Sequence, residues 1–480
     1  MKTKSKPYLI IAALLSLILL ISQINLFSNI WSLSMLPNTL FCILAAVSFL
    51  ICTALILMMI LKFQKIKARQ IIALFLTIVI ITLSFAGCFT IKKLNKTVEN
   101  ITHSKSSSSI GVYVLYDDTA KTIKDAKNYK FGITKSIDSY ITSEALKLIE
   151  KEINKEPLIE NHKSISEMIY ALYSHKVKAI LLSETQFNHL SEVEALSDFS
   201  KRARLIGSYA IEEKSDDKNN TNINVKSDTF IIYISGSDTR SKVLAKSRSD
   251  VNILAVVNPK TKNILLINTP RDYFVPNPAL GNELDKLTHC GLYGVQCSID
   301  ALSALYGKPV LGYVQINFAG FEKLIDTIGG ITVNSDVAFK TMHGDYDIKK
   351  GENHLNGNQA LCFVRERYAL AGGDNDRGKN QMKVISAIVD KLSASTIINN
   401  YSELLKSAEG MFSTNISNEF ISKLVKMQLS DMPKWEVKSY AVTGRGGMDK
   451  PASMYGSKAY VMYPNLDSVE EAKRLIEGLY

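Results

Sequence analysis

Long apolar runs dominate the first 94 residues of the chain. No Asp, Glu, Lys or Arg occurs between positions 8 and 61, and this run is too long for one membrane span of about 20 apolar residues. Ser, Asn and Pro37 interrupt the Leu and Ile residues over 29–39, where we expect the chain to fold back. A third uncharged stretch covers 70–91. The pattern therefore predicts a transmembrane unit over 1–94, with spans at about 8–29, 40–61 and 70–91.

Basic residues flank these spans in two clusters. The first cluster lies before the first span and the second lies between the second and third spans: Lys2, Lys4 and Lys6, and then Lys62, Lys65, Lys67 and Arg69. Because loops rich in Lys and Arg stay in the cytoplasm, we expect a cytoplasmic N-terminus and a large extracellular C-terminal region. Lys92 and Lys93 oppose this orientation, but the two larger clusters outweigh them. The chain is thus predicted to be a multi-pass protein of the cell membrane.

The chain beyond the spans changes to alternating polar and apolar positions. A polar, Ser-rich stretch over 95–109 is typical of a flexible stalk. A small α/β accessory domain is predicted over 110–211, and its expected elements are strand 110–116, helices 142–153 and 164–174, and buried strand 177–182. A tract of Lys, Asp, Asn and Thr then predicts a linker over 212–227.

The remaining residues, 228–480, form a second predicted soluble domain with a C-terminal extension. A strand at 229–234 precedes a hairpin whose strands, 251–257 and 263–268, are joined by a turn at 258–260. Further expected elements are helices 298–306, 318–328 and 377–393 and strand 311–315. Because strands alternate with helices, we expect a layered α/β core.

The net charge indicates which kind of partner the protein binds. The 480 residues carry a formal charge of +11 and the isoelectric point is near 9.1, which favours an anionic partner such as a membrane surface, a nucleic acid or a phosphorylated substrate. No zinc-finger spacing or basic helix leading into heptads is present, so nucleic acid is disfavoured. Gly-x-Ser-x-Gly, P-loop and His-Glu-x-x-His patterns are also missing from the sequence, which argues against serine hydrolases, nucleotidases and zinc proteases.

Two aspartates are candidate metal ligands. Asp238 follows the strand that ends at Ile234, and Asp250 precedes the strand that begins at Val251. If these strands are neighbours in one sheet, both carboxylates reach the same end of it, where they suit a hard cation such as Mg²⁺. The simpler interpretation is that each Asp serves as a turn or capping residue.

Several arginines are candidate anion ligands, namely Arg248, Arg271, Arg365, Arg367 and Arg377. An extended backbone through Glu366 would point Arg365 and Arg367 to one face. Arg377 stands at the head of a helix with Asp376 as its expected N-cap, where free N–H groups favour anions. If the five guanidinium groups converge, they suit the charged oxygens of a pyrophosphate. The alternative is that they are separate, solvated surface residues.

Other signals are weaker. Asp374-Asn375-Asp376 resembles the start of a calcium loop, but Lys379 replaces the required glycine. His289 is either a metal ligand or, as we expect for a lone His, a hydrogen-bonded polar residue. Cys290 and Cys297 either form a disulfide in an oxidising compartment or remain two buried thiols.

Together these segments resemble the LytR-CpsA-Psr family. The resemblance is carried by Ser247-Arg248-Ser249-Asp250-Val251-Asn252-Ile253-Leu254, Thr269-Pro270-Arg271-Asp272, Asp285-Lys286-Leu287-Thr288-His289 and Phe363-Val364-Arg365-Glu366-Arg367-Tyr368, and it extends over 374–381. Within the family, the sequence is most similar to capsule-biosynthesis members of Gram-positive cocci, which also combine three spans, an accessory domain and a catalytic domain. Cys290 and Cys297 depart from the small residues expected at their positions.

The resemblance implies a central mixed sheet flanked by helices, and the transfer of a glycopolymer, here a capsular polysaccharide, from a polyprenyl pyrophosphate carrier to peptidoglycan. It assigns Mg²⁺, with Mn²⁺ as the alternative ion, to Asp238 and Asp250. It assigns the pyrophosphate to Arg248, Arg271, Arg365, Arg367, Arg377 and Gln381. It also implies a hydrophobic pocket for the lipid tail, a pyrophosphatase side activity and the capsule export machinery as a partner.

In the expected mechanism, arginines and Mg²⁺ neutralise the pyrophosphate while a peptidoglycan sugar hydroxyl attacks. Arg365, Arg367 and Asp374 are the candidate catalytic residues. Asp374 or Asp272 accepts the proton of the hydroxyl, and we favour Asp374 because it lies beside the helix headed by Arg377. A different class of function is a non-enzymatic scaffold or regulator of capsule assembly that binds the carrier lipid. Transcription control is disfavoured, because every large folded part is predicted to lie outside the cell.

Overall fold

The computed structural model describes residues 6–60, 67–102, 107–134, 138–212, 223–237, 246–392, 403–404 and 411–480. The chain divides into two compact units. The first unit holds the three N-terminal helices together with α14 (Asn418–Asp431), and the second unit holds two α/β sheets with their helices.

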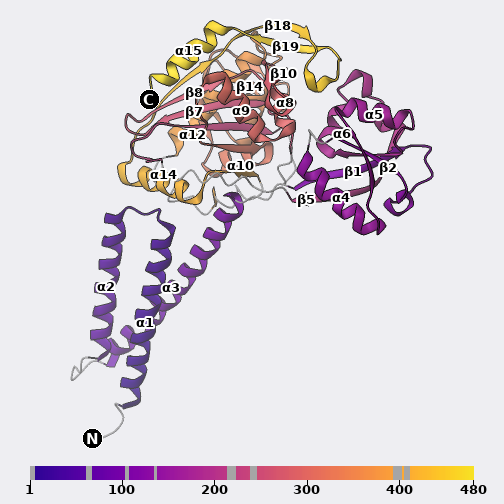
Figure 1. The fold of residues 1–480 in the computed structure, drawn as a ribbon. Helices are drawn as coiled ribbons and strands as arrows, with labels where there is room; N and C mark the ends of the chain where they lie inside the picture. The colour runs from indigo at the N-terminus through magenta and orange to yellow at the C-terminus, as the bar shows by residue number, and fades with distance from the viewer. Residues whose placement is uncertain are drawn as a thin grey trace. The chain divides into compact units, whose positions relative to one another are not determined.

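Three long apolar helices make up most of the first unit (Figure 1), as the apolar runs predict: α1 (Lys6–Leu33), α2 (Asn38–Ile60) and α3 (Lys67–Thr102). By length and composition each can cross a membrane, over Ile10–Leu33, Asn38–Ile60 and Ala68–Thr97. The Gln23 side chain of α1 joins all three, because it accepts a hydrogen bond from Ser48 of α2 (2.9 Å) and donates one to Ser84 of α3 (2.6 Å). Such polar contacts help apolar helices to associate in lipid.

The predicted stalk over 95–109 differs from the structure at both ends. Helix α3 continues to Thr102, and the first strand of the accessory domain begins at Ser107. Residues 103–106 lie outside the described residues. The helix continues because its sequence from Ile91 onwards keeps apolar residues three and four positions apart and contains no Gly or Pro.

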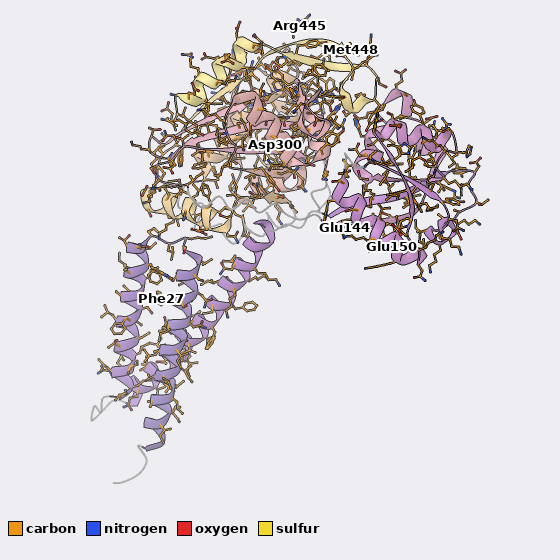
Figure 2. All side chains as sticks on the ribbon, viewed as in Figure 1. Phe27, Glu144, Glu150, Asp300, Arg445 and Met448 are labelled. Atoms are coloured by element: carbon orange, nitrogen blue, oxygen red, sulfur yellow. The ribbon has the colours of Figure 1, made fainter. Side chains whose placement is uncertain are left out.

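The accessory domain is a five-stranded sheet in the order β3-β2-β4-β1-β5. Its strands are β1 (Ser107–Leu115), β2 (Lys130–Thr134), β3 (Leu158–His162), β4 (Ala179–Ser183) and β5 (Ala203–Glu212). Its helices are η1 (Ile123–Ala126), α4 (Ser139–Ile153), α5 (Ile165–Tyr173), α6 (Glu184–Leu190), η2 (Glu194–Leu196) and α7 (Phe199–Arg202). Every residue of β4 is buried, because apolar clusters containing α4 residues and α5 residues cover opposite faces of the sheet. In Figure 2, Glu144 and Glu150 of α4 are drawn on the accessory domain and Phe27 on α1.

The larger domain is built on a six-stranded mixed sheet in the order β16-β11-β6-β7-β8-β17. Its strands are β6 (Phe230–Ser237), β7 (Val251–Asn258), β8 (Asn263–Asn268), β11 (Gly312–Asn317), β16 (Phe412–Thr414) and β17 (Glu436–Ala441). The predicted hairpin is present, since β7 pairs antiparallel with β8 and Asn258 faces Asn263. The linker residues 213–222 before this domain lie outside the described residues.

Helices cover both faces of this sheet, so the predicted layered α/β class is confirmed. The helices are α8 (Leu287–Cys290), α9 (Val295–Tyr306), α10 (Phe318–Thr327), α11 (Gly357–Arg365), α12 (Asp374–Lys391) and α15 (Leu466–Glu477). Side chains alternate along β7: Leu254 and Val256 pack with α9 and α15, whereas Ile253 and Ala255 pack with α12.

Small two-stranded sheets and short helices complete the domain. The sheets are β9 (Phe274–Asn277) with β10 (Glu283–Lys286), β12 (Ile331–Ser335) with β15 (Gly351–Leu355), β13 (Phe339–Lys340) with β14 (Asp347–Ile348), and β18 (Gly444–Asp449) with β19 (Ala459–Pro464). The short helices are η3 (Pro278–Leu280), η4 (Gly291–Tyr293) and η5 (Ala452–Met454).

Candidate active site

The end of the sheet where β6 stops and β7 starts carries Asp250. The two strands are antiparallel neighbours with Gly236 opposite Val251, and the backbone N–H of Asp250 donates to the Gly236 carbonyl at 3.3 Å. The strand pairing that the metal hypothesis requires is therefore present. Asp238 follows β6 closely but lies outside the described residues, so only one of the two candidate carboxylates has a described position.

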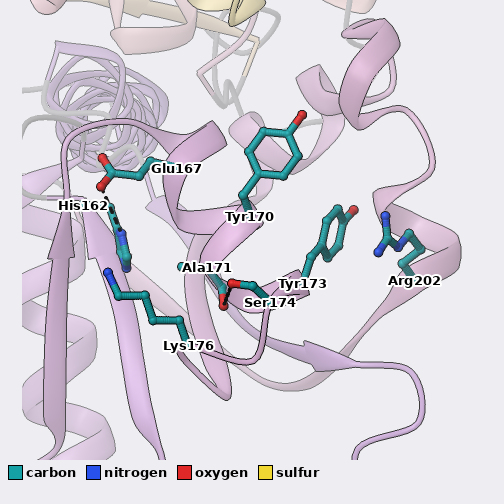
Figure 3. Close-up of a pocket in the computed structure, with 8 residues that line it drawn as sticks. All are labelled: His162, Glu167, Tyr170, Ala171, Tyr173, Ser174, Lys176 and Arg202. Atoms are coloured by element: carbon teal, nitrogen blue, oxygen red, sulfur yellow. Dashed lines mark hydrogen bonds and ion pairs between the residues drawn. The ribbon is translucent and has the colours of Figure 1, made fainter.

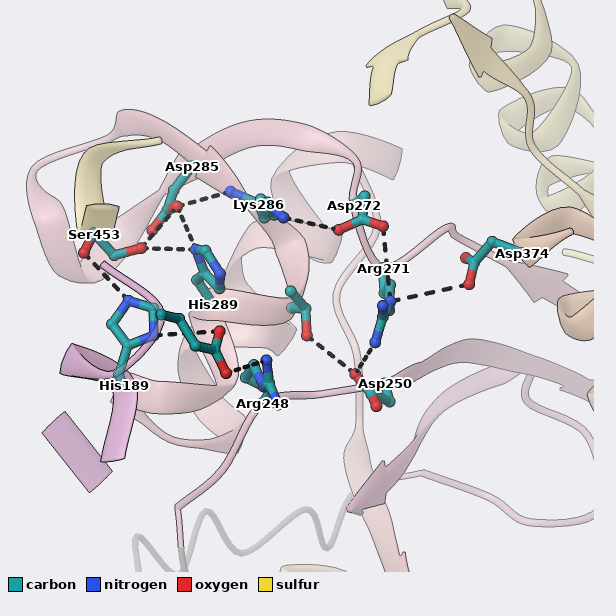
Figure 4. Close-up of polar contacts among 12 residues, drawn as sticks. His189, Arg248, Asp250, Arg271, Asp272, Asp285, Lys286, His289, Asp374 and Ser453 are labelled. Atoms are coloured by element: carbon teal, nitrogen blue, oxygen red, sulfur yellow. Dashed lines mark hydrogen bonds and ion pairs between the residues drawn. The ribbon is translucent and has the colours of Figure 1, made fainter. Parts of the chain in front are cut away.

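Arg271 reaches the same end of the sheet, because β8 runs antiparallel to β7 and its last residue, Asn268, lies opposite Ile253. Its guanidinium donates to Asp250 Oδ1 at 3.0 Å (Figure 4), and its Nε lies 3.7 Å from Asp272 and 3.9 Å from Asp374. The three carboxylates raise the pKa of Arg271, outweighing the opposing effect of burial. This arginine is thus a charged centre surrounded by acids.

Helix α12 supplies the other side of this cluster. Asp374 Oδ1 pairs with Arg377 at 2.6 Å, one helical turn along. Asp376 is not the N-cap: the helix begins at Asp374 after Gly373, whose φ of 54° favours glycine. Asp376 instead accepts a hydrogen bond from the Gly372 N–H at 2.8 Å. Two acidic residues in the first turn suit the positive end of the helix dipole, which explains the earlier start.

The helix lies close to the end of β8. A Cβ added at Gly378 would collide with the side-chain amide of Asn268, so only glycine allows this approach. The neighbouring Arg377 is therefore held near Arg271. Burial lowers the pKa of the Arg377 guanidinium, in opposition to Asp374, and Arg367 also contributes to this lowering.

Arg365 and Arg367 are not arranged as the extended backbone would place them. Arg365 is the last residue of α11, and the extended backbone begins at Glu366, with φ −67° and ψ 132°. The Arg365 guanidinium lies over the Phe318 ring at 4.5 Å, whereas Arg367 lies over the neighbouring Tyr368 ring at 4.5 Å and also donates to its hydroxyl. The prediction is wrong for Arg365 because the apolar stripe of α11 extends the helix through it.

Glu366 organises this turn, although the sequence suggested only a spacer. Its buried carboxylate accepts hydrogen bonds from four backbone N–H groups, those of Met342 (2.6 Å), Arg367 (3.0 Å), Tyr368 (2.9 Å) and Ala369 (3.0 Å). Burial alone would raise the pKa of Glu366, but these N–H groups lower it. The sequence signal that could have identified Glu366 is an acidic residue placed between two arginines.

The remaining predicted ligands, Gln381 and Arg248, contact residues outside the Arg271 cluster. Gln381, one turn beyond Arg377, is buried and donates to the Val364 carbonyl at 3.4 Å. Arg248 pairs with Glu192 of the accessory domain at 2.6 Å, a partner that no local sequence pattern indicates.

A buried polar network lies next to the cluster (Figure 4). His289 Nδ1 lies 2.8 Å from Asp285 and 2.7 Å from the hydroxyl of Ser453, which donates to Asp285 at 3.0 Å. His289 is thus hydrogen-bonded, as expected for a lone His. The trio is not a hydrolase triad, because one ring nitrogen faces both partners and Ser453 is completely buried. Cys290 and Cys297 are both free thiols.

A hollow in the accessory domain, with a volume of about 570 Å³, is a weaker candidate (Figure 3). Its charged groups already have partners within the domain: Lys176 pairs with Glu160 at 2.9 Å, and Arg202 lies 3.5 Å from the centre of the Tyr173 ring. These contacts account for its charges without a ligand.

The donor set fits Mg²⁺ only in part. Asp250 offers a carboxylate at the end of the sheet, but its Oδ1 also accepts from Arg271 and, at 3.4 Å, from Thr288. Within the described ranges, no group of three or more His, Cys, Asp or Glu side chains is arranged to hold a metal ion. A cation here would therefore need Asp238, phosphate oxygens or water as further ligands.

Comparison with known proteins gives consistent matches. TagU of Enterococcus faecalis, named "Polyisoprenyl-teichoic acid--peptidoglycan teichoic acid transferase", is 33% identical over 238 residues, which are 49% of this chain and 77% of that protein. TagU of Bacillus subtilis is 34% identical over 193 residues, which are 40% of this chain and 61% of that protein.

Among solved structures, TagV of Bacillus subtilis is similar, with a TM-score of 0.45 and 24% identity over 53% of this chain and 97% of that chain. Residues 200–471, more than half of the sequence, match the sequence model of the LytR_cpsA_psr family. The chain therefore belongs to the LytR_cpsA_psr family.

Proposed function

We propose that the protein transfers a glycopolymer from a polyprenyl pyrophosphate carrier to a hydroxyl of a peptidoglycan sugar at the outer face of the cell membrane. The observation that carries the proposal is the cluster of Arg271, Arg377, Asp250 and Asp374, which non-local segments bring to one end of the sheet. The printed names of the relatives specify teichoic acid transfer to peptidoglycan. For this chain the proposed polymer is a capsular polysaccharide, and teichoic acid is the competing one.

The proposed reaction is a phosphoryl transfer. The acceptor hydroxyl oxygen forms a bond to the phosphorus that carries the glycan, the P–O bond of the anhydride breaks, and polyprenyl phosphate leaves with the bonding electrons. Arg271 and Arg377 stabilise the charge that develops on the phosphate oxygens. This electrostatic role requires no covalent intermediate on the protein.

The charges of the cluster favour a divalent cation. Asp250, Asp272 and Asp374 are balanced by Arg271, Arg377 and Lys286, and Lys286 pairs with Asp272 at 3.2 Å. A pyrophosphate would add negative charge to this neutral set, so further positive charge is needed. Asp250 and Asp238 would hold Mg²⁺, or alternatively Mn²⁺, which would screen the phosphates, and Arg365 and Arg367 would add their own charges.

Asp374 is the proposed proton acceptor. Burial raises the pKa of this carboxyl group, even though Arg377 and Arg271 act to lower it. A raised pKa makes a carboxylate a stronger base near neutral pH. Asp374→Asn should therefore abolish the acidic limb of the pH–rate profile together with most of the transfer. If Asp374→Asn keeps normal transfer and lipid binding, the base is another group.

The decisive test compares Arg271→Lys with the wild-type chain in lipid nanodiscs. The assay follows a fluorescent glycan on a short polyprenyl pyrophosphate as it becomes attached to peptidoglycan. Lysine keeps the charge but lacks the forked donors, so transfer should fall on the order of 100-fold. Arg474→Lys on the exposed face of α15 is the matched control and should transfer normally.

Unchanged transfer by folded Arg271→Lys would refute the assignment of the site. The competing non-enzymatic function, a carrier-lipid scaffold or regulator, predicts that Asp250→Ala retains biological activity. The extracellular orientation is tested by labelling a single introduced cysteine at the exposed residue Ser191 with a membrane-impermeant thiol reagent in intact cells. Labelling only after lysis would place the domain in the cytoplasm.

A further inference from the structure

The segment that carries Arg248 is held from the accessory domain. Glu192, just beyond α6, pairs with Arg248 at 2.6 Å, and Asp138 pairs with Lys246 at 3.1 Å. The Thr185 hydroxyl at the start of α6 also donates to the Lys246 carbonyl at 3.1 Å. Three accessory-domain side chains therefore contact two residues of this segment, Lys246 and Arg248.

The same segment is held from the other side by the backbone of the larger domain. The Ser249 N–H donates to the Thr288 carbonyl at 3.1 Å. A Cβ added at Gly291 would lie only 2.5 Å from the Ser247 carbonyl oxygen and 2.8 Å from the Ser249 nitrogen. The backbone around Arg248 therefore has little room to move, and the direction of its long side chain depends on its side-chain partners.

The backbone at Glu192 is fixed by a buried histidine, because the Glu192 N–H donates to the His189 carbonyl at 3.0 Å. His189 Nε2 lies 3.2 Å from the Ser453 carbonyl, and since a carbonyl only accepts, this nitrogen carries the proton. The other ring nitrogen lies 4.0 Å from Glu192 Oε2. The ring also stacks edge-on against His289, at 5.0 Å between centroids. The backbone that carries Glu192 thus adjoins a buried histidine that contacts the larger domain through Ser453 and His289.

We propose that Glu192 is a positioning residue that orients Arg248 toward the pyrophosphate of the carrier lipid. The inference rests on the proposed function, and it adds Arg248, a pyrophosphate ligand according to the family resemblance, to the groups that bind the carrier. A carboxylate on one guanidinium nitrogen fixes the plane of the group, and an arginine has five N–H donors in all. Since a free arginine side chain loses considerable rotamer entropy on binding, prior ordering strengthens the phosphate contact.

A purely structural role explains this pair less well. The Arg248 and Glu192 side chains are 34% and 37% exposed, and ion pairs at such exposure contribute little to folding stability. Glu192 therefore serves the binding geometry, and the accessory domain completes a site whose other described residues belong to the larger domain.

The test measures binding of geranyl pyrophosphate, a short polyprenyl diphosphate, to the full chain in nanodiscs with Mg²⁺. Glu192→Gln should weaken binding about fivefold to tenfold without changing Tm, since the ordering of one long side chain is lost. Glu192→Asp should recover part of the affinity, because it retains the charge. Glu194→Gln, two residues along and also exposed, removes the same charge and should bind like wild type.

The double variant with Arg248→Ala decides whether Glu192 acts through Arg248. In that background Glu192→Gln should cause no further loss. Equal losses in both backgrounds, unchanged binding by Glu192→Gln, or tighter binding that marks Glu192 as an inhibitory partner would each overturn the inference.

The same titration separates this inference from the proposed function. If Arg248→Ala binds normally while Arg271→Lys binds weakly, the positioning role fails and the proposed site stands. If the wild-type chain does not bind geranyl pyrophosphate, or if both arginine variants bind normally, the proposed function itself fails.

Discussion

Acidification is expected to loosen the junction between the accessory domain and the larger domain through His189. This side chain is 3% exposed, and burial together with the nearby charge of His289 lowers its pKa to about 4. Asp285 acts in the opposite direction, and Arg248 lowers the pKa further. His189 is therefore neutral in the folded protein at neutral pH.

The size of the effect follows from the difference between the folded and unfolded pKa values. An exposed His titrates near pH 6.5, so a folded pKa of about 4 corresponds to about 3 kcal/mol of stability. The pKa is depressed in the folded state, so this stability is present above about pH 6.5. It is lost progressively as the pH falls from about 6.5 to about 4, because only the unfolded or opened form takes up the proton.

Hydrogen exchange of the full chain in nanodiscs, measured by mass spectrometry between pH 7 and 4 with correction for the intrinsic exchange rate, provides the assay. Peptides that cover α6 and η5 should lose protection as the pH falls. In His189→Gln, whose amide still donates to the Ser453 carbonyl but does not titrate, this dependence should be much smaller. His343→Gln, at an exposed position, is the control and should behave like wild type. Equal pH dependence in His189→Gln and wild type would refute the argument.

Three other substitutions test separate parts of the structure. Gly291→Ala must displace the Arg248 segment by about 0.9 Å to relieve the 2.5 Å contact. This displacement should cost about 1–3 kcal/mol of stability and lower transfer. Gly478→Ala is the control, and it should leave Tm and activity unchanged because its Cβ would meet its nearest atom at 3.5 Å. Gln23→Leu removes two hydrogen bonds between the membrane helices and should destabilise their association by about 1 kcal/mol in a steric-trapping or denaturation assay in micelles. Glu366→Gln withdraws the charge from four N–H groups and should lower Tm by an amount equivalent to about 2 kcal/mol, with a loss of transfer, and an unchanged melting curve would contradict the role given to that carboxylate.

The local pattern of the sequence was sufficient for most helices and for the central strands. Uncharged runs in the first 94 residues specify membrane helices because lipid exposure requires apolar side chains all around a helix. Alternation and turn residues specify the β7–β8 hairpin, and a helical stripe specifies α12. These features depend on neighbours close in sequence, and a single sequence contains that information.

The meeting of side chains from distant segments was decided by the tertiary structure alone. Asp250, Arg271 and Arg377 come together because β6, β7 and β8 are neighbours and because Gly378 allows α12 to approach β8. The periodicity of apolar residues in the sequence does not specify this strand order. Parallel pairing of β17 with β8 joins residues more than 160 positions apart for the same reason.

The arginines show most clearly which contacts the sequence alone does not predict. In the sequence Arg248 and Arg271 belong to one group of candidate anion ligands, but in the fold Arg271 pairs with Asp250 and Arg248 pairs with Glu192 of another domain. Glu192 is one exposed acid among many, and nothing in its neighbours distinguishes it. Which charges attract one another depends on distance in space, and that distance is set only when the chain has folded.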